Sequence, residues 1–263
     1  MKSIIITGAY GGMGLATTRA LASVGYRIFA LDRRVCENID GVIPVEVDLS
    51  CEESVKNAFD FVRLQCDNLF AIIHFAGVYM LDSLVEMETA DYDRIFDINV
   101  RGVFLVNKYF APLLSRGSRI LITTSELANL PPLPFTGIYA ITKGALDKYA
   151  YSLRMELQLL GIYVSVLRAG AVDTGMLGAS TEALSRFVEK TKLYSCNAKR
   201  FRGVVDSVES GAIPTSTLAR RVVKIIEKKK PCFAYKINRN FLLRLYGIMP
   251  KRLALFVIRK ILK

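Results

Sequence analysis

Two residues suited to proton chemistry stand four positions apart, Tyr139 and Lys143. They begin an apolar-patterned segment that predicts a helix over 139–160, and side chains at this spacing share one helix face. A tyrosine ordinarily titrates at about pH 10. A neighbouring cation stabilises the phenolate and lowers that pKa. The pair also fits an ordinary helix surface, but together with Ser125, at the end of a predicted strand, it indicates proton transfer at a substrate oxygen.

A glycine-rich turn lies near the start of the chain and reads Thr7-Gly8-Ala9-Tyr10-Gly11-Gly12-Met13-Gly14. It follows a predicted strand and opens a predicted helix, so backbone N–H groups at the helix N-terminus could bind a pyrophosphate. Asp32 closes the next predicted strand 24 residues after Gly8. A carboxylate there can accept the hydroxyls of an adenosine ribose, and it would repel a 2′-phosphate. Arg33 and Arg34 could partly offset that repulsion, but the pattern favours NAD over NADP.

Short β-branched runs alternate with longer segments of helical period from the first residue onward. The predicted strands are Ile4–Thr7, Arg27–Leu31, Val42–Val47, Phe70–Phe75, Arg119–Thr124 and Val164–Leu167, and the clearest helices are Glu53–Leu64, Tyr92–Leu114 and Tyr139–Leu160. Strands this apolar on both faces suit a parallel sheet covered by helices on each side. The sequence therefore predicts an α/β chain with a Rossmann-like, doubly wound parallel sheet and a ligand crevice at the carboxyl ends of the strands.

No linker rich in Pro, Gly or Ser divides the chain, so we expect a single catalytic domain over residues 1–236. Residues 172 to about 213 form a long stretch without a clear strand and are the candidate substrate lid. Its apolar residues, which could enclose a lipophilic substrate or merely pack, are Met176, Leu177, Leu184, Phe187, Val188 and Leu193. Residues 237–263 are expected to form an extension rather than a separate domain.

Composition excludes several classes of protein. One histidine and five cysteines without CxxC spacing argue against a metal site and a Ser-His triad. Scattered cysteines suit a reducing compartment, so we expect a cytoplasmic protein. The opening MKSIIITG is interpreted as a strand rather than a signal peptide. No run approaches the roughly 20 apolar residues of a membrane-spanning helix.

The positive charge is concentrated at the end of the chain. The net charge is +12, and residues 228–263 hold eleven Lys or Arg and no acidic residue. From Pro250 the sequence PKRLALFVIRKILK predicts a basic amphipathic helix. Such a helix could lie peripherally on an anionic membrane, pack over the body, or contact a second copy of the chain. Nucleic acid is not expected, because no reading motif accompanies the charge.

Taken in order, these motifs resemble the short-chain dehydrogenase/reductase family over roughly residues 2–235. They are TGxxxGxG, Asp32, Asp48-Leu49, Ala76-Gly77, Asn99, Ser125 and Tyr139-x-x-x-Lys143. The resemblance implies that Gly8, Gly12, Met13 and Gly14 hold the pyrophosphate, that Asp32 binds the ribose, and that Asp48 and Leu49 lie at the adenine. Asn99, Ser125, Tyr139 and Lys143 would form a catalytic tetrad, with Asn99 holding a water that links Lys143 to solvent. Lys143 would also bind the nicotinamide ribose, and Val172 and Thr174 match positions at the carboxamide.

Three positions depart from the pattern of that family. His74-Phe75 replaces Asn-Asn before Ala76-Gly77, and His74 is interpreted as a hydrogen-bonded structural substitute. Ala169 replaces the proline before Gly170, which should loosen the nicotinamide loop slightly. Ser125 lies 14 residues before Tyr139, one more than is common in the family, so the loop between them has absorbed an insertion.

The sequence therefore predicts an NAD(H)-dependent enzyme that interconverts a lipophilic secondary alcohol and its ketone. The large lid and basic apolar end resemble those of hydroxysteroid and retinol dehydrogenases. One alternative is a 3-oxoacyl-thioester reductase whose basic surface docks an acidic carrier. The other is a membrane-bound NAD-binding protein without catalysis. The family resemblance also implies a homodimer or homotetramer, with 92–114 and 139–160 as the interfaces.

Overall fold

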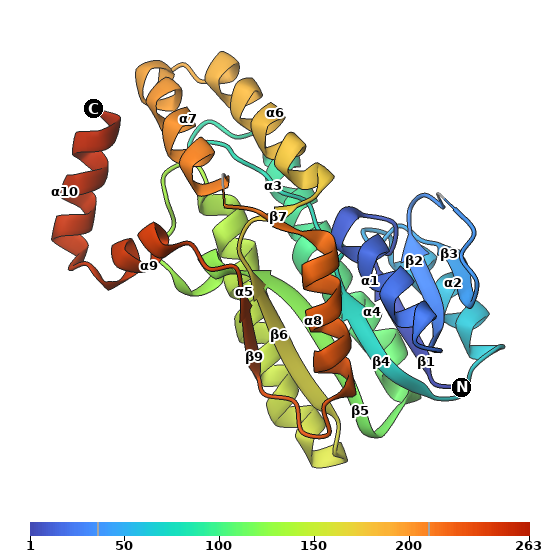
Figure 1. The fold of residues 1–263 in the computed structure, drawn as a ribbon. Coiled ribbons are helices and arrows are strands. Elements are labelled where there is room, and N and C mark those ends of the chain that lie inside the picture. Colours follow the sequence, from blue (N-terminus) through green and yellow to red (C-terminus); the bar gives the residue numbers. More distant parts are fainter. Residues whose placement is uncertain (36, 210) are drawn as a thin grey trace.

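The core of the molecule is a seven-stranded sheet in which every pairing is parallel (Figure 1). The computed structural model describes residues 1–35, 37–209 and 211–263. The strand order is β3-β2-β1-β4-β5-β6-β9. The strands are β1 Ser3–Thr7, β2 Arg27–Asp32, β3 Val42–Glu46, β4 Leu69–His74, β5 Leu114–Ser125, β6 Tyr163–Ala169 and β9 Ala234–Ile237. The central strands are buried along nearly their whole length, which is why they are apolar on both faces.

Helices cover both faces of this sheet. On one face α1 (Gly12–Ser23) packs beside α8 (Thr215–Glu227), with Leu21 and Val222 in the shared core. On the other face lie α2 (Glu52–Arg63), α4 (Gly102–Phe110) and α5 (Gly137–Leu157), whose buried residues form a second core cluster. This arrangement confirms the predicted Rossmann-like α/β fold. The chain order reverses between β1 and β4, so the carboxyl ends of these strands border the ligand crevice.

Two elements differ from the sequence-based prediction. The helix expected over 92–114 consists of α3 (Thr89–Phe96), a π-helical turn over Asp97–Arg101 and α4. A 3₁₀ turn over Ala111–Leu113 follows α4 and ends the helical segment. The π turn carries Asn99, and π turns often occur at functional sites. The seventh strand, β9, was not predicted, because its sequence Ala-Tyr-Lys-Ile is not a β-branched apolar run. It pairs with the end of β6 and so lies directly beside the crevice.

The segment predicted to be a lid contains two helices, α6 (Gly175–Lys190) and α7 (Ser195–Glu209), joined to the body by the two-residue strands β7 (Val172–Asp173) and β8 (Ile213–Pro214). After β9 come α9 (Phe241–Ile248) and α10 (Lys251–Leu262), which lie at one side of the molecule, where α10 contacts α7 (Figure 1). A third core cluster joins these regions through Leu184, Phe187, Phe201, Leu243 and Leu262. The lid and the C-terminal helices therefore share one apolar core, separate from the two cores of the sheet.

None of the helices in the described part of the chain combines the length and apolarity needed to cross a bilayer.

Candidate functional site

The glycine-rich turn between β1 and α1 has no room for side chains at three positions. Gly8 has a φ of 65°, and a Cβ on it would lie 2.6 Å from the backbone nitrogen of Ala76. A Cβ on Gly14 would overlap the carbonyl oxygen of Gly8, and one on Gly12 would lie 2.8 Å from the Cβ of Thr174. With no Cβ at these three positions, the N-terminus of α1 can be approached closely by an anionic group, as binding of a dinucleotide pyrophosphate requires.

Asp32 ends β2 with its carboxylate fixed by backbone donors. Its Oδ2 accepts a hydrogen bond of 2.9 Å from the N–H of Tyr10, and its Oδ1 accepts one of 2.7 Å from the N–H of Arg33. These contacts tie the carboxylate to the glycine turn and hold it at the wall of the crevice. Its place and orientation fit a ribose whose hydroxyls donate to the remaining lone pairs.

The crevice itself is a cavity of about 740 Å³ along the carboxyl ends of the strands. Of the residues predicted to bind a cofactor, the cavity is lined by Gly8, Gly12, Met13, Gly14, Asp32, Asp48, Leu49, Ala76, Gly77 and Thr174. Asp48 uses Oδ1 to accept the N–H and hydroxyl of Ser50, and these hydrogen bonds lower its pKa. The residues expected at the pyrophosphate, ribose and adenine thus lie along one continuous cleft.

Ser125, Tyr139 and Lys143 converge at the inner end of this cleft. Ser125 ends β5 and accepts the N–H of Leu127, while Tyr139 and Lys143 come from the first two turns of α5. The Lys143 ammonium donates to the carbonyl of Thr123 at 3.3 Å and lies 5.6 Å from the centroid of the Tyr139 ring. Burial lowers the pKa of Lys143 to about 8.

The pKa of Tyr139 differs from the expectation based on helix spacing. Burial is the largest cause of a raised pKa, and the neighbouring phenol of Tyr79 adds to it, with ring centroids 4.9 Å apart. Only the hydrogen bond with Ser125 lowers it. Lys143 does not lower the pKa here, because burial lowers its own pKa to about 8, so it loses its charge before the phenol ionises, and its Nζ donates to Thr123 instead. Tyr139 therefore remains a protonated phenol at neutral pH in the protein alone.

Asn99 projects from the π-helical turn into the same region and is fully buried. Its Oδ1 accepts the N–H of Val78 at 2.8 Å, and its Nδ2 donates to the carbonyl of Val78 and to the hydroxyl of Thr142. A Cβ on Gly77 would lie 3.2 Å from Asn99 Oδ1 and 3.3 Å from Lys143 Nζ. Asn99 and Lys143 thus lie on one side of Gly77, and Asn99 ties the loop after β4 to α5.

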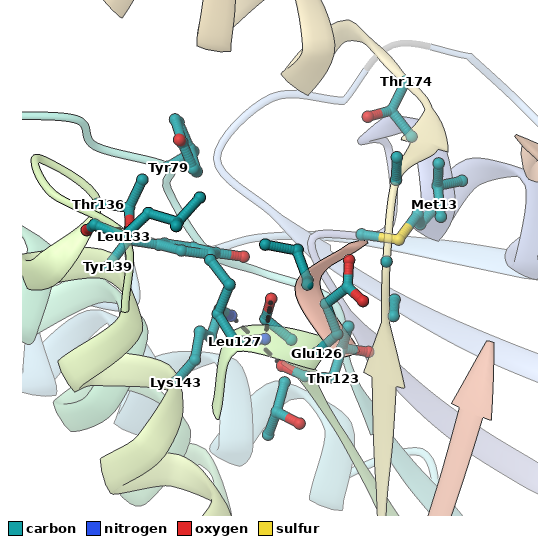
Figure 2. A pocket seen from close by; sticks show the side chains of 18 of the residues that line it. Met13, Tyr79, Thr123, Glu126, Leu127, Leu133, Thr136, Tyr139, Lys143 and Thr174 are labelled. Carbon is teal, nitrogen blue, oxygen red and sulfur yellow. Dashed lines mark hydrogen bonds between the residues drawn. The ribbon is translucent and has the colours of Figure 1, made fainter. Parts of the chain in front are cut away.

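A smaller pocket of about 170 Å³ adjoins these residues (Figure 2), and it shares Met13, Phe75, Gly77, Tyr79 and Thr174 with the cofactor cleft. Ser125, Tyr139, Lys143 and Val172 all line it. The rest of its wall is largely apolar and includes Leu127, Leu133, Phe201, Val205 and Leu243. This pocket is suited to hold an apolar group with its reacting carbon near Ser125 and Tyr139.

The lid contributes to this pocket through residues other than those named from sequence. Phe201 and Val205 of α7 line it, whereas Leu184, Phe187 and the half-buried Val188 pack into the third core cluster and Leu193 is exposed. The side chains of Met176 and Leu177 lie outside those that the structure describes.

Sequence reasoning also missed Glu126, which lines the pocket directly after Ser125. Its position next to a predicted catalytic serine was the available signal.

The departures from the family pattern have local structural explanations. His74 is buried in β4, its Nε2 lies 3.0 Å from Asn107 Oδ1, and burial lowers its pKa to about 4. It is therefore a neutral, hydrogen-bonded group, as expected, and lines neither cavity. The loop after Ala169 is not loosened at its backbone. The N–H of Gly170 donates to the carbonyl of Ile237, and the side-chain amide of Asn238 donates to the carbonyl of Ala171. The unpredicted strand β9 holds this loop.

Comparison with known proteins identifies the family. The family model for short chain dehydrogenase matches residues 2–185. A 3-amino-tetrahydro-pyrrolizinone reductase of Xenorhabdus hominickii is 30% identical over 73% of this chain and 71% of its own. Estradiol 17-beta-dehydrogenase 2 of Mus musculus is 29% identical over 68% of this chain and 50% of its own.

Solved structures agree in fold. A 3-ketoacyl-(acyl-carrier-protein) reductase from Brucella melitensis complexed with NADH has a TM-score of 0.72 at 20% identity, covering 90% of this chain and 96% of that one. A short chain dehydrogenase from Burkholderia cenocepacia in complex with NADP has a TM-score of 0.71 at 23% identity with the same coverage. With its parallel sheet, glycine turn and Tyr-x-x-x-Lys helix, this chain belongs to the short-chain dehydrogenase/reductase family of oxidoreductases.

Proposed function

We propose that this protein is an NAD(H)-dependent oxidoreductase that interconverts a lipophilic secondary alcohol and its ketone. The observation that carries the proposal is the position of Ser125 and Tyr139 in an apolar pocket that opens into the glycine-lined cleft. One relative is named for a reduction and the other for a dehydrogenation, which fits a reaction between alcohol and ketone.

In this proposal each residue of the site has a separate task. When bound, the nicotinamide ring supplies or accepts the hydride at the substrate carbon. Ser125 hydrogen-bonds the substrate oxygen through Oγ, and Tyr139 gives or takes its proton through Oη. Lys143 holds the nicotinamide ribose and places a positive charge near the phenol, and Asn99 holds a water that links Lys143 to solvent. The positive charge of an oxidised nicotinamide ring, when bound, would oppose the effect of burial on the Tyr139 pKa.

The preference for NAD follows from Asp32. Its carboxylate is held in place by two backbone N–H groups and faces the cleft where a ribose would lie. A 2′-phosphate at this place would meet a like charge. Family members are seen with either cofactor, as the NADH and NADP complexes illustrate, so Asp32 is the residue on which this part of the proposal depends.

A panel of alcohols and ketones tests the reaction. Turnover is monitored by the absorbance of NADH. We expect the highest kcat/KM for lipophilic secondary alcohols, hydroxysteroids included, because the pocket around Tyr139 is apolar. A short polar alcohol of the same carbinol geometry serves as the control substrate. Faster turnover of an acetoacetyl thioester with NADPH would contradict the proposal in favour of a thioester reductase.

We also propose that the C-terminal helices lie against an anionic membrane surface. α10 packs on α7 and joins the third core cluster through Ile258 and Leu262, and Ala254 is also buried, so the apolar stripe of α10 is partly used inside the protein. The outer face of α9 is nevertheless apolar and exposed, as are several residues of α10. The exposed set is Phe241, Leu242, Leu245, Ile248, Leu253, Leu255, Phe256 and Ile261, and the exposed basic residues of the same helices are Arg244, Lys251, Arg252, Arg259 and Lys260. Apolar side chains among basic ones suit an anionic bilayer, whose charge they complement.

Sedimentation with vesicles tests this surface. The full chain should pellet with phosphatidylserine-containing vesicles and stay in solution with neutral ones. The double variant Phe241→Ser/Ile248→Ser should reduce the bound fraction about fivefold, because two exposed anchors are lost. Leu64→Ser/Leu159→Ser is the matched control, since both residues are exposed far from α9 in the sequence. Equal vesicle binding by the two double variants would refute a membrane contact. So would a Phe241→Ser/Ile248→Ser variant whose oligomeric mass changes while its vesicle binding does not.

A homodimer or homotetramer through α4 and α5 is a further part of the proposal. The outer faces of these helices expose Phe104, Ile141, Tyr151 and Met155, which a second copy of the chain could cover.

A further inference from the structure

The carboxyl group of Glu126 is buried in the substrate pocket beside the reacting groups. Glu126 follows Ser125 at the end of β5 and is 6% exposed. It lines the same pocket as Tyr139, and Figure 2 shows its carboxylate and the Tyr139 hydroxyl entering the same space from two elements. The pocket wall around it is formed mostly by Leu, Phe and Val side chains.

Glu126 differs from the other buried carboxylates in lacking a cation. Among the described residues, Asp82, Glu126 and Asp147 are the buried acidic side chains. Asp147 pairs with Arg168 at 2.7 Å, and Asp82 pairs with Lys190 at 3.2 Å. Within that same part of the chain, Glu126 forms no ion pair: its Oε2 accepts the N–H of Asn240 at 2.9 Å, and Arg239 acts on it only at longer range.

The second carboxylate oxygen lies next to another residue of the pocket wall, Gly170. Oε1 lies beside Gly170, 3.1 Å from where a Cβ on that glycine would be, and no hydrogen bond to it occurs among the described residues. Burial raises the pKa of Glu126, as expected for a carboxyl with one backbone donor. A buried carboxylate of this kind is normally paired with a cation.

We propose that the Glu126 carboxylate is a subsite for a protonated amine that the substrate carries close to its reacting carbon. The preferred substrate would then be an apolar amino alcohol or amino ketone. An ammonium supplies both the hydrogen-bond donor and the positive charge that Glu126 lacks, whereas a hydroxyl supplies only the donor. This inference rests on the proposed alcohol–ketone reaction, whose substrate it makes more specific.

Paired substrates and a conservative variant test the subsite. The wild-type enzyme and Glu126→Gln are assayed with 1-amino-2-dodecanol and with 2-dodecanol, at a pH where the amine is protonated. Glutamine keeps an oxygen that can accept the Asn240 N–H, but it carries no charge. We expect the ratio of kcat/KM, amino alcohol over plain alcohol, to fall about tenfold or more in Glu126→Gln. An unchanged ratio, or a wild-type preference for 2-dodecanol, would overturn the subsite.

Two further measurements separate the other roles that Glu126 could have. Asn240→Ala weakens the cap of α9, whose Leu242 and Leu243 N–H groups bond the Asn240 side chain, but keeps the carboxylate. Its substrate ratio should therefore stay at the wild-type value, and a fall equal to that of Glu126→Gln would mean that Glu126 only anchors α9. Glu126→Gln could instead weaken the binding of NAD⁺ more than that of NADH, relative to the wild-type protein, and leave the substrate ratio unchanged. This result would mean that the carboxylate serves the cofactor and would overturn the subsite.

A binding experiment without turnover distinguishes this inference from the proposed reaction. Octylamine has no oxidisable carbinol, so its affinity in titration calorimetry reports the subsite alone. Weaker octylamine binding by Glu126→Gln, together with no oxidation of any alcohol, would support the subsite and refute the reaction. Equal octylamine binding by both proteins, with active oxidation of 2-dodecanol, would support the reaction and refute the subsite.

Discussion

Replacing Tyr139 with phenylalanine is expected to lower kcat by about 10³-fold while leaving the Kd for NADH within about a factor of two. The variant removes the pocket hydroxyl that is hydrogen-bonded with Ser125 and that is proposed to pass a proton to the substrate oxygen. Phenylalanine keeps the ring that packs at 4.9 Å against Tyr79, so the pocket should keep its shape. Stopped-flow NADH oxidation measures the first quantity, and NADH fluorescence titration measures the second.

Tyr151→Phe is the matched control for this variant. Tyr151 lies on the same helix, is 54% exposed and lines neither cavity, so the identical chemical change should leave kcat near the wild-type value. If Tyr139→Phe keeps more than a few per cent of the wild-type kcat, Tyr139 is not the proton-transferring residue. If both kcat and NADH binding are lost, the Tyr139 hydroxyl is needed to hold the cofactor site together, and the variant does not test proton transfer alone.

The parts of this site that sequence could predict are those fixed by short local rules. The turn after β1 requires glycine at two positions, because Gly8 has a positive φ and a Cβ on Gly14 would overlap the carbonyl of Gly8. Requirements of this kind are visible as a sequence motif. Tyr139 and Lys143 share a face because a helix repeats every 3.6 residues. The six strands found by their apolar β-branched runs are also local features.

What sequence could not predict depends on contacts between distant segments. The π-helical turn at Asn99 inserts one residue into a helical pattern, and the packing of Asn99 against Val78 and Thr142 decides where it falls. Strand β9 is defined by its pairing with β6 rather than by its own period. The raised pKa of Tyr139 and the lowered pKa of Lys143 come from burial, which spacing along one helix does not reveal.

The C-terminal helix shows the same limit. Its sequence is compatible with a membrane surface, with packing on the body and with a second copy of the chain. The structure packs Ile258 and Leu262 with the lid and leaves Leu255 and Phe256 exposed. Leu243 of the preceding helix also lines the substrate pocket. A partner on this surface would therefore lie close to the entrance of the site.

The cofactor preference should depend on Asp32 more than on any other side chain. We expect Asp32→Ser to change the ratio of kcat/KM for NADH over NADPH by about 100-fold in favour of NADPH, since each factor of ten corresponds to about 1.4 kcal/mol. Two causes act together. Charge-assisted hydrogen bonds to the ribose, each worth about 1.5–3 kcal/mol, are lost for NADH. Repulsion of a 2′-phosphate, up to about 4 kcal/mol at a near-surface dielectric before screening by salt, is removed for NADPH.

The cleft already holds groups that could serve the phosphate in this variant. Arg33 and Arg34 line it, and the N–H groups of Tyr10 and Arg33, which bond the carboxylate in the wild-type protein, become available to a new acceptor. Asp40→Ser is the matched control, because Asp40 is an exposed carboxylate in the same segment that lines neither cavity. Initial rates with both cofactors at one ionic strength measure the ratio. If the wild-type enzyme already prefers NADPH, or if Asp32→Ser and Asp40→Ser change the ratio equally, the Asp32 carboxylate does not select NAD, and the two arginines must dominate the field around the ribose.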